Sequence, residues 1–122
     1  MNTVVISVKS LDESRKETQE LVRNRRGQGN AVPRINFVSW DLFHRVLAPN
    51  RMAVVNAMTG AGPLSIREIA RRVHRDFKGV HTDITALLDS GVLEKTEEGL
   101  VVFPYDEIHF DFVMRAADQS AA

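Results

Sequence analysis

The amino-acid sequence predicts an α+β fold, because β-branched segments flank a central region with helical periodicity. The segment 3–8, Thr-Val-Val-Ile-Ser-Val, is typical of a strand. Between Ser39 and Gly91, apolar residues recur at the spacing of helices. The stretch 92–103 is typical of a β-hairpin. With 122 residues and 43% hydrophobic content, we expect one domain of ordinary size with its own core.

The segment 1–32 is expected to form a β-α extension, because it is too short to bury a core alone. Ser10 precedes a leucine and two acidic residues, which is typical of a helix N-terminus. A helix is therefore predicted over 10–26, and the composition of 27–33 indicates a loop.

A short strand is predicted over 35–38, and two helices follow it. Ser39 is a good N-cap for the first helix, which Pro49 ends. Asn50 can cap the second helix, predicted over 51–59 before a glycine-rich turn.

The next two predicted helices are amphipathic. Ser65 caps a helix over 66–74, and after a turn at Asp76-Phe77 a last helix ends at Gly91. Gly79 is expected to weaken the start of this last helix by about 1 kcal/mol relative to alanine. Its core-facing side chains are predicted to be Val80, Ile84, Leu87 and Leu88.

The C-terminal part is expected to be β-structured. A hairpin is predicted from 92–96 and 100–103 around an acidic turn with a glycine. Residues 115–122 are polar and alanine-rich, so they are expected to fray. Between 105 and 114, a final strand is indicated by alternating apolar residues: Ile108, Phe110 and Phe112.

Composition excludes several classes of function. Without cysteine, the chain has no disulfide, no thiol nucleophile and no cysteine-based zinc site. An apolar run of about 18 residues and a signal-peptide pattern are both missing, so we expect a cytoplasmic protein with no membrane contact. The motifs of common catalytic sites are missing too, so no enzyme activity and no cofactor are predicted.

Two short His-x-Asp strings, at His81 and His109, could chelate a metal ion. Two ligands make a weak site. On a helix, His81 and Asp83 would also point about 200° apart. No metal site is predicted, and a metal-responsive repressor is a third interpretation.

Helices followed by a hairpin, with a short turn between the last two helices, are the order of a winged helix-turn-helix. The sequence resembles that superfamily over Leu64–Pro104. Leu-Ser-Ile-Arg-Glu-Ile-Ala-Arg-Arg-Val at 64–73 is similar to the first helix of the unit, and 78–93 is similar to a recognition helix running into the wing. The resemblance implies that this recognition helix lies in the DNA major groove.

A narrower resemblance covers Phe37 to Tyr105, with the string Val-Phe-Pro-Tyr-Asp-Glu-Ile after the wing. This part is similar to a small prokaryotic family of winged-helix transcriptional regulators, some of which are thought to be encoded beside toxin-like proteins. The resemblance implies a DNA-binding regulator. The alternative is a winged helix that serves as a protein-interaction module, such as an antitoxin whose acidic end binds a basic toxin-like partner.

The formal net charge is zero because unlike segments cancel. Residues 1–32 carry +2, residues 33–104 carry +1 and residues 105–122 carry −3. Within the middle segment, residues 65–82 hold five Lys and Arg against two acidic residues, a net of +3. This local patch favours phosphate contact over a merely solvated helix face.

Candidate DNA contacts follow from the predicted inward face of the last helix. Its outward residues could reach base edges: Lys78, His81, Thr82 and Thr85. Residues that could contact phosphate are Ser65, Arg67, Arg71, Arg72, Arg75, Lys95 and Thr96. The tip of the predicted hairpin is acidic and therefore a poor contact for phosphate, so the hairpin is expected to contact DNA through the residues flanking the tip.

We therefore expect a sequence-specific transcriptional regulator, such as a repressor, that binds double-stranded DNA as a homodimer. The DNA-binding domain is predicted over 33–104, with a dimerisation element over 1–32 and a strand and tail over 105–122. Segments 3–26 and 108–112 have no predicted partner inside the winged helix, so we expect them to build the dimer interface.

Overall fold

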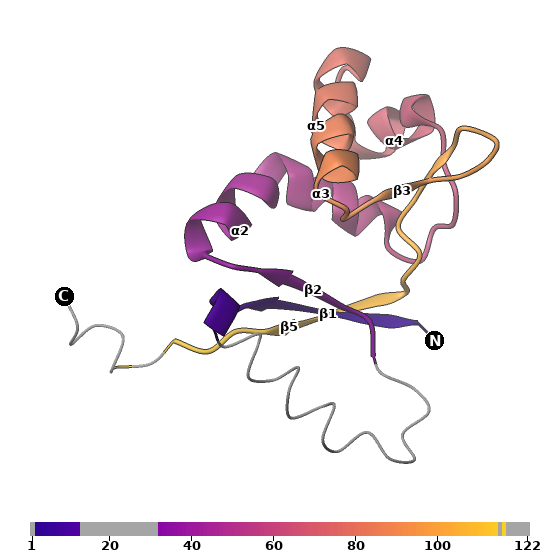
Figure 1. Ribbon diagram of the computed structural model, residues 1–122. Helices are drawn as coiled ribbons and strands as arrows, with labels where there is room; N and C mark the ends of the chain where they lie inside the picture. Colours follow the sequence, from indigo (N-terminus) through magenta and orange to yellow (C-terminus); the bar gives the residue numbers. More distant parts are fainter. Residues whose placement is uncertain (1, 13–31, 115, 117–122) are drawn as a thin grey trace.

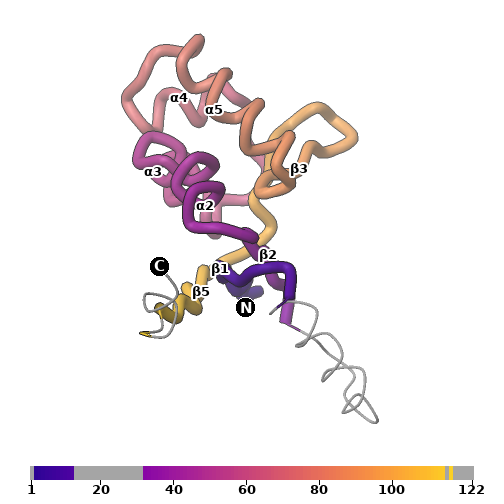
Figure 2. Tube along the Cα trace, turned by 60° about the vertical axis from the view of Figure 1, so that its left-hand side comes forward, coloured from indigo at the N-terminus to yellow at the C-terminus, as the bar shows by residue number. Residues whose placement is uncertain are grey.

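The computed structural model describes residues 2–12, 32–114 and 116, which form an α+β fold (Figure 1). A parallel sheet lies at one end of the molecule and a helical part with a hairpin at the other, as Figure 2 also shows. The predicted α+β class is confirmed. The described helices are α2 (Trp40–Val46), α3 (Pro49–Met58), α4 (Ile66–Val73) and α5 (Phe77–Asp89). The described strands are β1 (Thr3–Val8), β2 (Arg34–Phe37), β3 (Glu94–Lys95), β4 (Val101–Val102) and β5 (Glu107–Asp111).

Strand β1 is the centre of the parallel sheet, whose order among the described residues is β2-β1-β5. Ile6 of β1 is opposite Ile35 on one side and Phe110 on the other. Beyond the end of the pairing, the Asp106 N–H donates a hydrogen bond to the Asn2 carbonyl at 2.8 Å. The beginning of the described chain and its last strand are therefore held together.

The expectation that segments 3–26 and 108–112 have no partner inside the winged helix is corrected by the sheet, in which β1 pairs with β2 of the predicted domain 33–104. β1 and β5 are partners of each other, with residues 3–7 paired to residues 107–111. Parallel strands need long connections, so the pairing joins segments that are distant in sequence and leaves no local pattern. The predicted helix over 10–26 and the predicted frayed tail lie almost wholly outside the described residues.

The boundary between α2 and α3 was predicted only in part. The cap at Ser39 is confirmed, because its Oγ accepts a hydrogen bond from the Leu42 N–H at 3.1 Å. The prediction that Pro49 ends a helix and Asn50 caps the next was wrong. Pro49 begins α3 after the N-cap Ala48, because its missing N–H and fixed φ suit the first helical position.

Helices α4 and α5 both begin at a side-chain cap. Ser65 Oγ accepts a hydrogen bond from the Glu68 N–H at 3.1 Å, as predicted. Asp76 Oδ2 accepts from the Gly79 N–H at 2.8 Å. This second cap makes Phe77 the first residue of α5 rather than part of a turn.

The β3–β4 hairpin is shorter than predicted. Its strands pair over two residues each, and Gly99 has a φ of +84° in the turn. Val92 and Leu93 are buried instead of paired, and both N–H groups donate to the Leu87 carbonyl. On its other side, β4 forms an antiparallel bridge with Leu64. The hairpin is thus tied to the segment that precedes α4.

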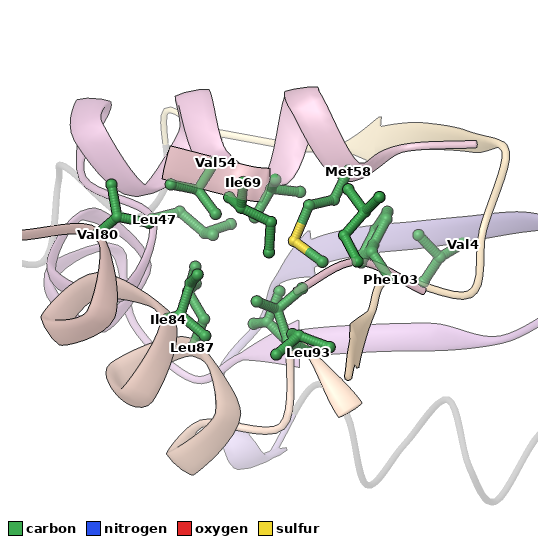
Figure 3. Close-up of a cluster of buried hydrophobic side chains, with 14 of the residues drawn as sticks. Val4, Leu47, Val54, Met58, Ile69, Val80, Ile84, Leu87, Leu93 and Phe103 are labelled. Carbon is green, nitrogen blue, oxygen red and sulfur yellow. The ribbon is translucent and has the colours of Figure 1, made fainter. Parts of the chain in front are cut away.

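One core of buried side chains connects the sheet to the helices (Figure 3). Val4 of β1 and Phe103 lie at one end of this cluster, and Val80, Ile84 and Leu87 of α5 lie at the other. None of these five side chains is more than 1% exposed. β1 is therefore part of the common core and not an appendage to it.

Replacing Ile6 with alanine tests the role of β1. Ile6 is fully buried in the central strand, so Ile6→Ala should lower the free energy of unfolding by about 2–5 kcal/mol. Urea unfolding followed by circular dichroism measures this change. The control is Glu98→Ala at the exposed hairpin tip, which should stay within about 0.5 kcal/mol. Equal stabilities for the two variants would contradict the central position of β1.

Candidate nucleic-acid interface

The outward face of α5 carries the four side chains predicted to contact bases. Because α5 buries its opposite face in the core, Lys78, His81, Thr82 and Thr85 are all exposed. The hydroxyl groups of the two threonines donate to helix carbonyls, at 3.1 Å for Thr82 and 2.9 Å for Thr85. Their oxygens keep acceptor capacity toward solvent. The outward face of α5 therefore offers both hydrogen-bond donors and acceptors, and the buried opposite face holds the helix in place.

On α4, Glu68 binds two of the arginines predicted to contact phosphate. Its carboxylate receives Arg71 Nη2 at 2.6 Å and Arg72 Nε at 2.7 Å, while Arg71 Nε reaches the other oxygen at 2.9 Å. The hydrogen bonds from Arg71 and then Arg72 lower the pKa of Glu68 from 4.5 to about 2. The same contact raises the pKa of Arg71. A phosphate bound by either arginine would therefore compete with this carboxylate or use the guanidinium N–H groups that do not contact Glu68.

Arg75 lies in a second cluster, which joins α5 to α3. Asp83 Oδ2 receives Arg75 Nη1 at 2.7 Å, and Asp83 Oδ1 receives Arg51 Nε at 3.2 Å. All three side chains are at most about one quarter exposed. This cluster joins α5 to α3, so Arg75 helps to position α5.

The sequence analysis missed this second cluster. Arg51 was not singled out, and Asp83 was considered only as a metal ligand beside His81. A usable signal exists, because Asp83 stands three residues after Val80 and one before Ile84, at the edge of the buried face of α5. A half-buried carboxylate at that position needs a cationic partner.

Gly79 makes room for these contacts at the start of α5. A Cβ atom there would stand 3.1 Å from Asp76 Oδ1 and 3.2 Å from Arg75 Nη2, closer than most real Cβ contacts. The glycine that lowers helix propensity therefore allows the Asp76 cap and the Arg75 guanidinium to approach the helix closely.

Phe77 is a further surface residue that the sequence analysis left unassigned. Its side chain is 46% exposed at the first position of α5. The Arg67 guanidinium carbon lies 5.8 Å from the ring centroid, and the His81 ring lies 5.9 Å away. Arg67 and His81, both predicted DNA contacts, are thus brought together on one aromatic side chain.

The remaining residues predicted to contact phosphate differ in whether their side chains already have a hydrogen-bond partner. Ser65 and Thr96 use their side-chain oxygens as acceptors for the N–H groups of Glu68 and Leu100. Lys95 is exposed on β3. Among the described residues, the cations on this surface that form no ion pair within 4.0 Å are Arg67, Lys78 and Lys95.

Within residues 2–12, 32–114 and 116, no group of three or more His, Asp or Glu residues is placed to hold a metal ion. No helix there has both the length and the apolar character needed to cross a membrane.

Comparison with family models finds a match for part of the chain. A family model described as HVO_A0114 matches residues 46–110, which is more than half of the chain. The match begins at the end of α2 and runs through α3, α4, α5, the hairpin and most of β5. No curated protein and no solved structure matches the chain. The match contains every candidate contact residue and leaves out β1 and β2.

The pairing of Glu68 predicts a specific pH dependence. The folded pKa of Glu68 is about 2 against an ordinary 4.5, so the stabilisation is present above 4.5 and is lost as the pH falls toward 2. In an NMR titration the Glu68 carboxyl should have its midpoint near 2, and the midpoint should rise in Arg71→Gln/Arg72→Gln. A midpoint that is the same in both proteins would show that the arginines do not hold this carboxylate.

Proposed function

The chain belongs to the HVO_A0114 family, and we propose that its matched segment forms a winged helix-turn-helix that binds double-stranded DNA. In this proposal α3, α4 and α5 are the three helices, and the β3–β4 hairpin is the wing. The order of these elements and the bridge from Leu64 to β4 support the assignment. The observation that carries the DNA-binding function is the exposed polar and cationic face of α5 above a fully buried apolar face.

Each part of this surface has a role in the proposed complex. α5 lies in the major groove, where Lys78 can donate to guanine or phosphate oxygens. His81, Thr82 and Thr85 can accept or donate at base edges. Arg67, which has no carboxylate partner among the described residues, holds a phosphate and sets the register of the helix.

The ion pairs of α4 make the proposed binding selective. Glu68 offsets one of the two charges of Arg71 and Arg72, so this cluster attracts phosphate less than two unpaired arginines would. Binding without base contacts is then weak, because non-specific affinity comes from phosphate neutralisation. Sequence-dependent contacts of α5 have to supply the rest, as a sequence-specific regulator requires.

We further propose that the regulator is a homodimeric repressor, because one module of this size has a small DNA contact and two half-sites multiply specificity. An aromatic cluster between α2 and β5 supplies a surface for the second copy. Phe112 contacts Trp40 at 5.2 Å and Phe43 at 4.9 Å between ring centroids. Apolar residues exposed around this cluster are Val38, Phe110, Val113 and Met114.

A second candidate function, binding of a basic toxin-like protein, has support at the sheet edge. In the described part of the chain β5 has a neighbouring strand on one side only. Asp106 and Glu107 are exposed, although each also accepts a hydrogen bond from the β1 side, from Asn2 and Thr3. The open edge of β5 and these acidic residues could together take up a basic extended segment. Mobility shifts with the purified protein separate the candidates, because only the DNA-binding proposal requires a shift without a partner.

The DNA-binding proposal predicts a change in salt dependence. Arg67→Ala/Lys78→Ala should weaken binding to a DNA fragment selected from random sequences. The slope of log K against log salt should fall in magnitude by about 0.9 for the phosphate contact of Arg67, and by about 1.8 where Lys78 also donates to a phosphate oxygen. Fluorescence anisotropy at four salt concentrations measures the slope.

The matched control for this prediction is Arg45→Ala, which removes an exposed charge from α2, away from the proposed interface. It should leave the slope within experimental error. Equal slopes for wild type and the double variant would contradict contact through Arg67 and Lys78.

Lysine substitutions at exposed apolar residues next to the aromatic cluster test the proposed dimer. Val113→Lys/Met114→Lys should shift the mass in sedimentation equilibrium from two chains toward one, because burying unpaired ammonium groups is unfavourable. Val32→Lys is the control, since Val32 is also an exposed valine but lies outside the aromatic cluster. A dimer of unchanged affinity in the double variant would rule out this surface.

A further inference from the structure

Phe77 is an exposed aromatic residue on the surface proposed to bind DNA. In the described part of the chain, the other exposed large hydrophobic residues lie in or next to the strands of the parallel sheet, or just before α2. Phe77 alone in this set is on α5 or α4. Its exposure is unfavourable in water, and the cap that starts α5 is supplied by Asp76 instead. The capping of α5 therefore does not explain an aromatic residue at this position.

The surroundings of Phe77 hold the ring at the surface. The Arg67 guanidinium carbon lies 5.8 Å from its centroid and comes from α4, while His81 lies 5.9 Å away and comes from the next turn of α5. Cationic and polar neighbours restrict the ring without covering it. The ring is also at the N-terminus of α5, the part of a recognition helix that reaches base edges.

These neighbours indicate what the ring can bind. A phenyl ring has no hydrogen-bonding atom, so on DNA it needs an apolar group. In the major groove that group is the C5-methyl of thymine. Arg67 against the ring and the exposed Lys78 next to Phe77 in sequence suit the negative charge of nearby phosphates, so the charge around Phe77 matches nucleic acid rather than an apolar protein surface or a lipid.

We propose that Phe77 recognises the methyl group of one thymine in each half-site and is a specificity determinant of the protein. The inference rests on the proposed DNA binding and deepens it. Phe77 selects thymine over the other bases by apolar contact, while Lys78 and His81 make the polar contacts on either side.

Deoxyuridine substitution tests this contact, because it removes only the methyl group of thymine. Each thymine of a DNA fragment selected by the wild-type protein is replaced in turn, and affinity is measured by fluorescence anisotropy. At one position per half-site, the wild type should lose roughly fourfold in affinity, the change that corresponds to burial of one methyl group. Phe77→Ala should bind thymine and deoxyuridine at that position equally.

A second variant separates the contact from a general effect on folding. Phe77→Leu keeps an apolar side chain and should retain most of the preference for thymine, and thermal unfolding by circular dichroism verifies that both variants fold. An equal loss in wild type and Phe77→Ala would overturn the inference while leaving the DNA-binding function intact. A wild-type protein for which no bound sequence can be selected would instead overturn the proposed function, and this inference with it.

Discussion

The arrangement of the proposed interface depends on the burial of one face of α5. Val80, Ile84 and Leu87 have no exposed surface, so the helix cannot rotate without exposing them to water. The ion cluster around Asp83 fixes the same orientation from the side, through Arg75 at 2.7 Å and through α3. Together these contacts determine which residues face outward. They give the proposed recognition surface its rigidity before any DNA is bound, which lowers the entropic cost of binding.

Charge on this surface is arranged in two ways. Arg71 and Arg72 are held by Glu68 on an exposed helix face, where ion pairs are weak and exchangeable. Arg75 is held by a less exposed carboxylate and supports the fold. Three arginines that look alike in the sequence therefore fall into two groups, two in an exposed ion pair and one that supports the fold. This division agrees with a chain of zero net charge that is proposed to rely on base contacts more than on bulk electrostatic attraction.

Local signals in the sequence predicted the elements that local chemistry determines. Ser39 and Ser65 cap the helices they were expected to cap, and the apolar spacing from Val80 to Leu87 gave the inward face of α5. The pairing of β1 with β5 could not be predicted, because parallel strands from distant segments share no short-range pattern. The position of Asp83 at the edge of the buried face indicated that a cation was needed, but it could not identify Arg51, which is 32 residues away.

Amide chemical-shift mapping shows whether the outward face of α5 is the surface that binds double-stranded DNA, as we propose. A ¹⁵N-labelled protein is titrated with a DNA fragment selected from random sequences. If α5 binds DNA as proposed, the largest shift changes should fall on residues 77–85 and around Arg67, with little change in β1 and β2. Changes centred on β5 and α2, or no change at saturating DNA, would contradict this proposal.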